Sequence, residues 1–400
     1  MHINDLLKTA VERKASDLHL KVGAFPVLRI DGVLKPLGEL RRLLQEDTVA
    51  MAFSIMSARQ KEKFKTDLEI DTSYQVPTLG RFRCSIFQQR GTVGLVLRVI
   101  PTRILTIREL LLPPVLEKIC LEQRGLVLCT GTTGSGKTTT LAAMVDHINM
   151  QRNEHIMTIE DPIEYLHRDK KSIVNQRELD VDTRGFSVAL RSALRQDPDV
   201  ILVGEMRDVE TIGTALTAAE TGHLVLSTLH TLDATETVNR IITLFPPHQH
   251  RQIRLQLGAV MKAVISLRLM PRADGLGRVP AVEVLVQTEY VRDCIENKEK
   301  TKYIKEAIKA GTSQYGMQSF DQSLYQLYKS GLITLEEALK RATNPNEFRL
   351  KIQGIQSTSD IAREEMDADL EAPTDYGPVS EDESPFDFSR QPPGAADGRR

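Results

Sequence analysis

The 400-residue sequence lacks the features of a membrane, secreted or tryptophan-rich protein. Its longest apolar runs, such as 200–203 and 224–226, are far shorter than the ~18 residues that a membrane-spanning helix needs. Asp5, Lys8 and Glu12 lie where a signal peptide would have an uninterrupted apolar stretch. Tryptophan is absent, yet 41% of the residues are hydrophobic and 26% are charged, as in ordinary soluble domains. A cytoplasmic enzyme is therefore the default expectation.

The cysteines are few and poorly spaced for metal binding. Cys84, Cys120, Cys129 and Cys294 contain no C-x-x-C pair, which argues against a zinc site. A disulfide framework is typical of much shorter secreted chains. Neither a structural zinc ion nor a set of disulfides is expected.

Neither sign of charge dominates, because the net charge of −2 averages over two unlike regions. Residues 357–400 carry twelve acidic and four basic side chains, a charge of −8, and five of the 18 prolines. The remaining residues carry a charge of +6. We expect 357–400 to be a disordered acidic tail, since it has too little apolar surface to offset the entropy of ordering. The mildly basic remainder does not indicate nucleic-acid binding.

The length suggests two or three domains, and the pattern of the chain changes near residue 100. Residues 1–100 predict a small α/β domain: the apolar positions between Ile3 and Val11 have helical spacing. Asp31-Gly32 indicates a two-residue hairpin turn, because both turn positions favour positive φ. Prolines bracket the stretch 101–114, which we predict to be a linker.

The second domain is predicted at 115–356, where strands alternate with helices as in a mostly parallel sheet covered by helices. The expected strands are 126–129, 156–159, 200–203 and 224–226, and the expected helices are 138–148, 187–195 and 209–219. After the last strand the chain is expected to be helical. There Thr334 and Glu337 form a T-x-x-E capping box, and Gly331 lies where the preceding helix should end.

A phosphate-binding motif lies between the first of these strands and the first of these helices. Gly131–Thr138, GTTGSGKT, matches the P-loop pattern G-x-x-x-x-G-K-[ST]. Its glycines let backbone N–H groups face phosphates, and the following helix N-terminus adds positive potential. Lys137 would bridge the β- and γ-phosphates, and the Thr138 hydroxyl would bind Mg²⁺. The predicted ATP-binding residues are Thr132, Thr133, Gly134, Ser135, Gly136, Lys137, Thr138 and Thr139.

Candidate catalytic side chains follow three further strands, at the end where such sheets bind ligands. Glu164 follows the strand 156–159 and the residues Glu160-Asp161-Pro162. Glu205 follows 200–203 as in a Walker B element, although Gly204 stands where an Asp is more usual. His230 follows 224–226. One of the carboxylates should orient or deprotonate the attacking water. The alternative for each is a strand-end cap or a surface salt bridge.

The P-loop domain offers no obvious arginine for the transition state, but the first domain has two candidates. Arg83 and Arg98 lie on predicted strands of that domain. Strand arginines are commonly solvated or salt-bridged. Supplied from a neighbouring subunit, an arginine would instead accelerate phosphoryl transfer by ~10³–10⁵ and couple turnover to assembly. Arg191, Arg195 and Arg207 are expected to have structural roles.

Taken together, these motifs resemble a known family. The succession Ala15–Leu20, Gly131–Thr138, Thr158–Glu164, Gly204–Asp208 and Ala219–Thr231 is similar to the type II/IV secretion superfamily of hexameric ATPases. Within it, the chain resembles the PilT/PilU retraction motors of type IV pili, over residues 1 to about 356. The resemblance implies a RecA-like P-loop ATPase domain with a C-terminal helical subdomain, preceded by a smaller PAS-like α+β domain.

The resemblance also implies roles and partners. Lys137 and Thr138 would bind phosphate and Mg²⁺, Glu164 would position the water, Glu205 would be the Walker B carboxylate and His230 would sense the nucleotide. Arg83 and Arg98 match the arginines of the family's N-terminal domain. A homohexamer with ATP between subunits, seated at the inner-membrane base of the pilus on a platform protein, is implied. No nucleic-acid partner is expected.

The resemblance favours pilus retraction over extension, because extension relatives have a longer N-terminal region and a four-cysteine metal motif. Residues 204–208 and 216–223 are similar to the PilT branch. Residues 316–322 and 348–352 are more similar to PilU, the accessory retraction ATPase. Three alternatives therefore stay open: a primary retraction motor, an accessory one that works beside a second ATPase, and a nucleotide-gated interaction module with little turnover.

Overall fold

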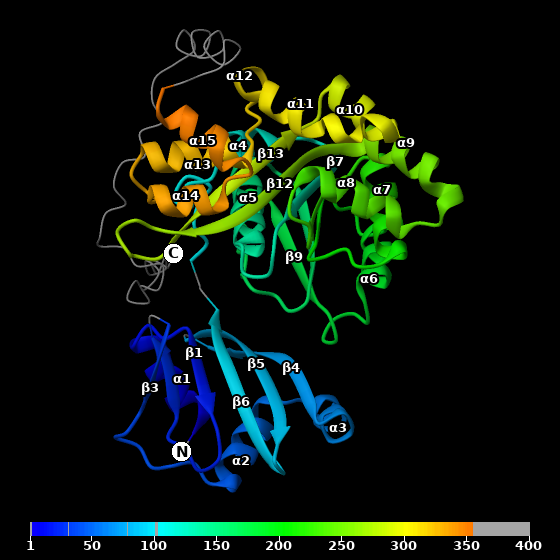
Figure 1. Cartoon of the computed structure of the whole chain (residues 1–400). Helices are drawn as coiled ribbons and strands as arrows, with labels where there is room; N and C mark the ends of the chain where they lie inside the picture. Colours follow the sequence, from blue (N-terminus) through cyan, green and yellow to red (C-terminus); the bar gives the residue numbers. More distant parts are fainter. Residues whose placement is uncertain (1, 31, 78, 101–102, 355–400) are drawn as a thin grey trace, which may run out of the picture. The chain divides into compact units, whose positions relative to one another are not determined.

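The computed structural model describes residues 2–30, 32–77, 79–100 and 103–354, which form two compact units (Figure 1). The first unit comprises the described residues of Met1–Arg103 together with Pro162–Leu166, and the second comprises Ile104–Asp161 and the described residues from His167 onward. Asp31 of the predicted hairpin, residues 101–102 of the predicted linker and the predicted tail 357–400 lie outside the described residues.

The first unit is built on a six-stranded antiparallel sheet with the strand order β3-β2-β1-β6-β5-β4. The strands are β1 (Asp17–Leu20), β2 (Val27–Ile30), β3 (Val33–Pro36), β4 (Glu69–Val76), β5 (Gly80–Gln89) and β6 (Thr92–Ile100). The helices are α1 (Ile3–Glu12), α2 (Gln45–Ile55) and α3 (Ala58–Asp67). The predicted N-terminal helix is confirmed, and β2 and β3 form the predicted hairpin.

The core of the first unit follows from alternation along β5. Phe82, Cys84 and Ile86 are fully buried against α1 and α2 residues of one hydrophobic cluster, while the residues between them point to the other face. This period of two is what a sheet with one covered face requires. The other face of β5 and β6 carries Arg81, Arg83 and Arg98 beside apolar residues such as Val96.

The second unit contains a seven-stranded sheet with the order β13-β12-β7-β11-β10-β8-β9. All neighbours are parallel except β12 and β13, which are antiparallel. The strands are β7 (Gly125–Thr130), β8 (His155–Glu160), β9 (Ile173–Glu178), β10 (Val200–Val203), β11 (Leu224–Leu229), β12 (Met261–Pro271) and β13 (Arg278–Val286). The four predicted strands are confirmed as β7, β8, β10 and β11.

Helices cover both faces of this sheet. They are α4 (Val115–Ile119), α5 (Lys137–Gln151), α6 (Phe186–Ala193), α7 (Val209–Glu220), α8 (Ala234–Leu244), α9 (His250–Val260), α10 (Glu289–Glu296), α11 (Ile304–Ala310), α12 (Thr312–Tyr315), α13 (Phe320–Lys329), α14 (Leu335–Arg341) and α15 (Pro345–Ile352), with 3₁₀ turns η1 (Pro247–Gln249) and η2 (Lys298–Tyr303). Val127 and Cys129 of β7 pack with α5, whereas Leu126 and Leu128 pack with α7 and α8. Being covered on both faces, the central strand β7 is buried along its whole length.

The expectation that the chain is helical after β11 is wrong in one respect. The strands β12 and β13 come after α9 and extend the sheet beyond β7 (Figure 1). Both strands are buried on both faces over most of their length, and polar residues such as Ser266 and Glu283 interrupt their apolar residues. The sequence therefore showed neither a clean alternation nor a continuous apolar run. The P-loop strand β7 consequently has a neighbour on each side, β11 and β12, and lies inside the sheet.

Helix caps near the C-terminal end agree in part with the sequence. Gly331 adopts φ 73° just after α13, and the Thr334 side chain accepts a hydrogen bond from Glu337 N at 3.3 Å. The Glu337 carboxylate lies 3.8 Å from Lys340 Nζ. Thr334 therefore caps α14 as predicted, while Glu337 pairs with a lysine one turn further along. The helices α13, α14 and α15 pack together around a small apolar cluster (Figure 1).

The described residues also bear on the expectations about cysteines, metal sites and membrane-spanning helices. All four cysteines there are free and buried, and no group of three metal-ligating side chains occurs among those residues. In the same part of the chain, no helix has the length and apolar character that crossing a membrane requires.

The packing of β5 predicts that Phe82→Ala destabilises the first unit by about 3–5 kcal/mol, because it removes a fully buried ring and leaves a cavity. Urea unfolding followed by circular dichroism measures this as a lower transition midpoint. Val33→Ala, at a position 58% exposed in the same unit, should change the midpoint little. Equal midpoints for the two variants would contradict this account of the core.

Candidate nucleotide-binding site

The P-loop connects β7 to α5 through a turn that only glycine can make at its first position. Gly131 has φ 141°, and a Cβ there would lie 2.5 Å from Ser135 Oγ and 2.6 Å from Leu267 O. Gly136, which precedes α5, has φ 99°. Both values are in the region that L side chains avoid, so the pattern of glycines is a condition for the loop's shape.

Within the loop, donor groups converge where the pattern predicts phosphate binding. Lys137 is 8% exposed, and its Nζ donates to Gly131 O at 2.9 Å and to Thr132 O at 3.0 Å. Ser135 Oγ is buried and has no hydrogen-bond partner within the described protein. A buried hydroxyl without a partner and a curled lysine fit an incoming anion, which would give both of them a stronger acceptor.

The helix after the loop adds its own electrostatic contribution. α5 runs for 15 residues from Lys137, and its N-terminal N–H groups lack partners within the helix, so they give this end a partial positive charge. Thr138 and Thr139 lie in the first turn, Thr138 exposed and Thr139 half-buried. A hydroxyl oxygen is a hard ligand of the kind that Mg²⁺ accepts together with phosphates and water. The residues present therefore fit a nucleotide with its magnesium ion.

Glu205 and His230, both predicted site residues, lie near each other. The strands β10 and β11 are parallel, with Val203 opposite Ser227, so their carboxyl ends meet at one edge. His230 Nε2 is 3.6 Å from Glu205 Oε2, and the Glu205 side chain is only 13% exposed. Arg207 Nη2 pairs with the other oxygen of Glu205 at 2.6 Å. The structure thus groups a carboxylate, an imidazole and a guanidinium at the ends of these strands.

Sequence reasoning missed Arg207 as part of this group. It is 73% exposed at its side chain, and it reaches Glu205 across a single intervening residue. The expectation was a structural role, as part of a basic helix face or in an inter-domain salt bridge. The pairing with Glu205 could not be read from the sequence, because Asp208 next to it is an equally plausible partner. Asp208 instead caps α7 by accepting from Thr211 N at 2.8 Å.

The strand β8 contributes a buried carboxylate that was also missed. Glu160, the last residue of β8, is 7% exposed and accepts hydrogen bonds from Thr158 Oγ1 at 2.6 Å and Gln176 Nε2 at 3.0 Å. Glu164, which the sequence favoured, lies beyond the strand in a loop and is half-exposed. The alternation along β8 places Glu160 on the face that α5 covers, and this alternation was the signal available in the sequence.

Arg83 and Arg98 are direct cross-strand neighbours in the first unit. The register of β5 and β6 pairs Arg83 with Arg98, and that of β1 and β6 pairs Asp17 with Arg98. Arg98 Nε donates to Asp17 Oδ1 at 2.9 Å, while its side chain stays 64% exposed. Arg83 Nη2 is 3.8 Å from Asp71. Like charges opposite each other on a sheet repel, and the carboxylates offset part of this cost.

The other arginines that were expected to be structural have local partners. Arg191 pairs with Glu210, and Arg195 Nη1 donates to the carbonyl of Arg191 at 3.1 Å. Both pairs connect residues on α6, its C-terminal end and α7. They agree with a structural role for these two residues.

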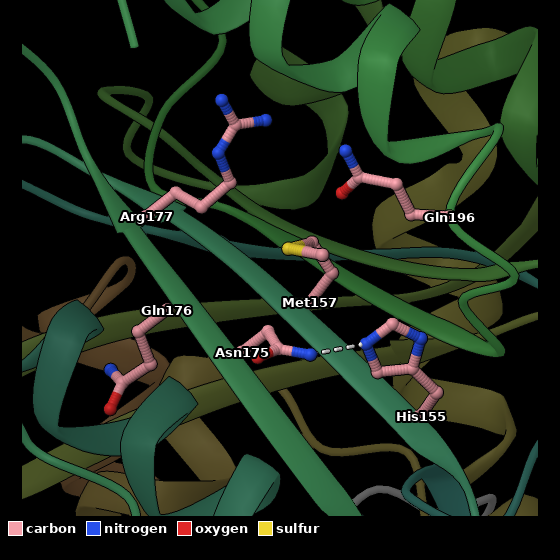
Figure 2. Close-up of a pocket in the computed structure, with 6 residues that line it drawn as sticks. All are labelled: His155, Met157, Asn175, Gln176, Arg177 and Gln196. Atoms are coloured by element: carbon pink, nitrogen blue, oxygen red, sulfur yellow. Dashed lines mark hydrogen bonds between the residues drawn. The ribbon is translucent and has the colours of Figure 1, made fainter. Parts of the chain in front are cut away.

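A separate cavity of about 420 Å³ lies at the β8–β9 edge of the second sheet (Figure 2). Its lining includes His155, Met157, Asn175, Arg177 and Gln196. Asn175 Nδ2 is 2.8 Å from His155 Nε2, and His155 Nδ1 is 3.0 Å from Asp197 O, which fits an imidazole protonated on Nδ1. None of the predicted site residues lines this cavity, so it is not part of the P-loop site.

The turn at Gly131 predicts that Gly131→Ala weakens nucleotide binding by at least about tenfold, because the new methyl group must displace Ser135 or the backbone at Leu267. Titration with fluorescent ADP measures the dissociation constant. Gly213→Ala in α7 is the matched control, since no atom lies within 4 Å of its added Cβ. Unchanged affinity in Gly131→Ala would refute this reading of the loop.

Comparison with known proteins agrees with the geometry. Over 348 residues, the chain is 46% identical to the type IV pilus retraction ATPase PilT of Pseudomonas aeruginosa, covering 87% of this chain and 100% of that protein. It is 43% identical over 361 residues to the type IV pilus ATPase PilU of the same organism, covering 90% and 94%. The solved structure of the pilus retraction motor PilT with bound ADP superposes with a TM-score of 0.81, at 47% identity over 87% of this chain and 98% of that one.

The family model described as Type II/IV secretion system protein matches residues 1–341. This match and the relatives confirm the predicted α/β fold and the predicted kinship with pilus retraction ATPases. The chain belongs to the type II/IV secretion system protein family.

Proposed function

We propose that this protein is a hexameric, Mg²⁺-dependent ATPase that powers the retraction of type IV pili. One observation carries the proposal: a P-loop with a buried, partnerless Ser135 hydroxyl and a curled Lys137 lies in the same sheet as the Glu205–His230 pair. The names of the relatives, a retraction ATPase and a pilus ATPase, support the same activity.

ATP would bind with its phosphates in the loop 131–138. Lys137 would exchange the carbonyls of Gly131 and Thr132 for the β- and γ-phosphate oxygens, which accept stronger, charge-assisted hydrogen bonds. Thr132–Thr139 would supply the other backbone and hydroxyl contacts. Thr138 would hold Mg²⁺, which neutralises charge that develops on the phosphates.

The carboxylates and His230 would act on the attacking water and report the state of the nucleotide. Glu164 would position the attacking water, and Glu205, the Walker B carboxylate, would orient or deprotonate it. His230, at 3.6 Å from Glu205, would sense whether the γ-phosphate is present. Arg207 pairs with one oxygen of Glu205, which would keep that carboxylate oriented.

Arg83 and Arg98 would complete the site from a neighbouring subunit. They lie in a unit that has no P-loop, and they stand opposite each other on β5 and β6 despite mutual repulsion, Arg83 half-buried and Arg98 64% exposed at its side chain. Such an arrangement suits the binding of a highly charged anion, for which two forked donors are better than one. Closure of one subunit's first unit on the next subunit's nucleotide would convert hydrolysis into movement within a hexamer.

The protein would work in the cytoplasm, at the cytoplasmic face of the inner membrane. Its partner would be the platform protein at the base of the pilus, and a second retraction ATPase is a further candidate. The body of the chain carries only a +6 charge before residue 357, so nucleic acid is not a proposed partner.

An accessory role beside a primary retraction motor is the second candidate. The identities to PilT and PilU, 46% and 43%, differ too little to choose between the two branches. Deletion of the gene alone separates them: loss of all retraction fits a primary motor, and a defect only under load fits an accessory one.

For the proposed chemistry, Glu205→Gln should lower kcat by at least about a hundredfold while leaving ATP affinity close to wild type, because only the acid–base group is lost. Steady-state hydrolysis and equilibrium ATP binding measure the two quantities. Glu210→Gln, at an exposed position on α7, is the matched control. Retained pilus retraction with Glu205→Gln in cells that lack other motors would instead support a nucleotide-gated interaction module.

A further inference from the structure

A carboxyl group outside the predicted site lies buried in the second unit. Glu283, in the middle of β13, is 5% exposed. Acidic side chains are rarely buried to this degree unless they are paired or have a functional task. Neighbouring polar groups connect it to the P-loop on one side and to the segment that carries His230 on the other.

The first connection runs across the sheet to the P-loop. In the registers of β7, β12 and β13, Thr130 lies opposite Ser266, and Ser266 lies opposite Glu283. Thr130 Oγ1 donates to Ser266 Oγ at 2.9 Å, and both residues are fully buried. The three polar side chains thus form a row inside an apolar sheet. The row ends at the residue just before Gly131.

The second connection runs to the segment that carries His230. Ala234, the first residue of α8, donates its backbone N–H to Glu283 Oε1 at 2.9 Å. The short segment between His230 and α8 is fastened to that helix, because Leu232 N donates to Glu236 Oε2 at 2.8 Å and the Thr231 and Thr237 hydroxyls are 2.7 Å apart. A shift of the α8 N-terminus would therefore move His230.

The charges around Glu283 decide its protonation. Burial raises its pKa to about 7, which the Asp233 carboxylate reinforces, whereas the Ala234 N–H, Lys305 and Arg268 act in the opposite direction. Lys305 Nζ is bound to Asp233 at 2.9 Å, and the Arg268 guanidinium stacks 3.7 Å above the Phe320 ring. These are the charged groups that α8, α11 and β12 present to the carboxyl.

We propose that Glu283 is a positioning residue for ATP hydrolysis: its carboxylate holds the N-terminus of α8, and with it His230, in place relative to the P-loop. This inference rests on the proposed function. A charged carboxylate accepts the Ala234 N–H more strongly than a neutral acid does, and it is favoured by the helix dipole at that end of α8. Protonation loosens the hold, so turnover declines as the group becomes neutral.

The proton on Glu283 has opposite effects on stability and on turnover. The fold is more stable when Glu283 is protonated, whereas turnover is faster when Glu283 is charged. Because the pKa of Glu283 is raised from 4.5 to about 7 in the folded protein, its contribution to stability is complete below pH 4.5 and is lost as the pH rises through 7. At pH 8 the buried charge therefore destabilises the fold. Replacing Glu283 with Gln, which keeps an acceptor oxygen without the charge, should raise the melting temperature at pH 8 and lower kcat.

The test compares kcat of the full-length wild type and Glu283→Gln at pH 6 and pH 8. The ratio of wild type to variant should be about three- to tenfold at pH 8, as for the loss of one charge-assisted hydrogen bond, and about one at pH 6. Glu299→Gln, at an exposed position on η2, should give a ratio of about one at both pH values.

Hydrogen–deuterium exchange of residues 231–239 in the wild-type protein gives a readout that needs neither catalysis nor a variant. After correction for the intrinsic pH dependence of exchange, protection of this segment should decrease from pH 8 to pH 6. A pH-independent kcat ratio, or protection that does not change with pH, would overturn the role of Glu283. Pronounced pH-dependent protection in a protein without any ATPase activity would instead refute the proposed function and leave the hold of Glu283 on α8 intact.

Discussion

The site depends on the place of β7 within its sheet. This strand is buried along its length between β11 and β12, and it delivers Gly131 to a point where the backbone must turn with φ 141° against Leu267 O. A rigid strand on one side and the 15-residue helix α5 on the other fix the curvature of the loop. Lys137 and Ser135 are therefore preorganised for an anion, which lowers the ordering cost of binding.

Parallel pairing of strands brings Glu205 and His230 to the same edge of the second sheet. Since β10 and β11 run in the same direction as β7, the segments that carry Glu205 and His230 leave the sheet at the same edge as the P-loop. The buried row from Thr130 through Ser266 to Glu283 connects this edge to the helix after His230. The first unit is arranged differently: on its antiparallel sheet, Arg83, Arg98 and Asp17 lie on the face opposite the one that carries the buried Phe82.

Local sequence patterns were sufficient to predict several strands of the second unit and the P-loop. Strands that are apolar and followed by turn residues, such as β7 and β10, were predicted closely, and the P-loop follows from spacing alone. The strands β12 and β13 were missed because both of their faces are buried, polar residues such as Ser266 and Glu283 included, and such burial does not follow from local pattern. Long-range pairing was out of reach: nothing in the sequence relates Ser266 to Thr130, or Glu283 to Ala234. The burial of Glu160 shows the same limit, since it depends on elements distant in the chain.

The central claim is that one subunit's arginines act on a nucleotide held by another. Co-expression of an Arg83→Ala/Arg98→Ala chain with a Lys137→Ala chain tests it, because each variant alone lacks a necessary part of every site. We predict that the mixed assemblies hydrolyse ATP far faster than either variant alone, since an intact P-loop then meets intact arginines across subunit boundaries. Activity of the mixture no greater than the sum of the two variants would contradict the account.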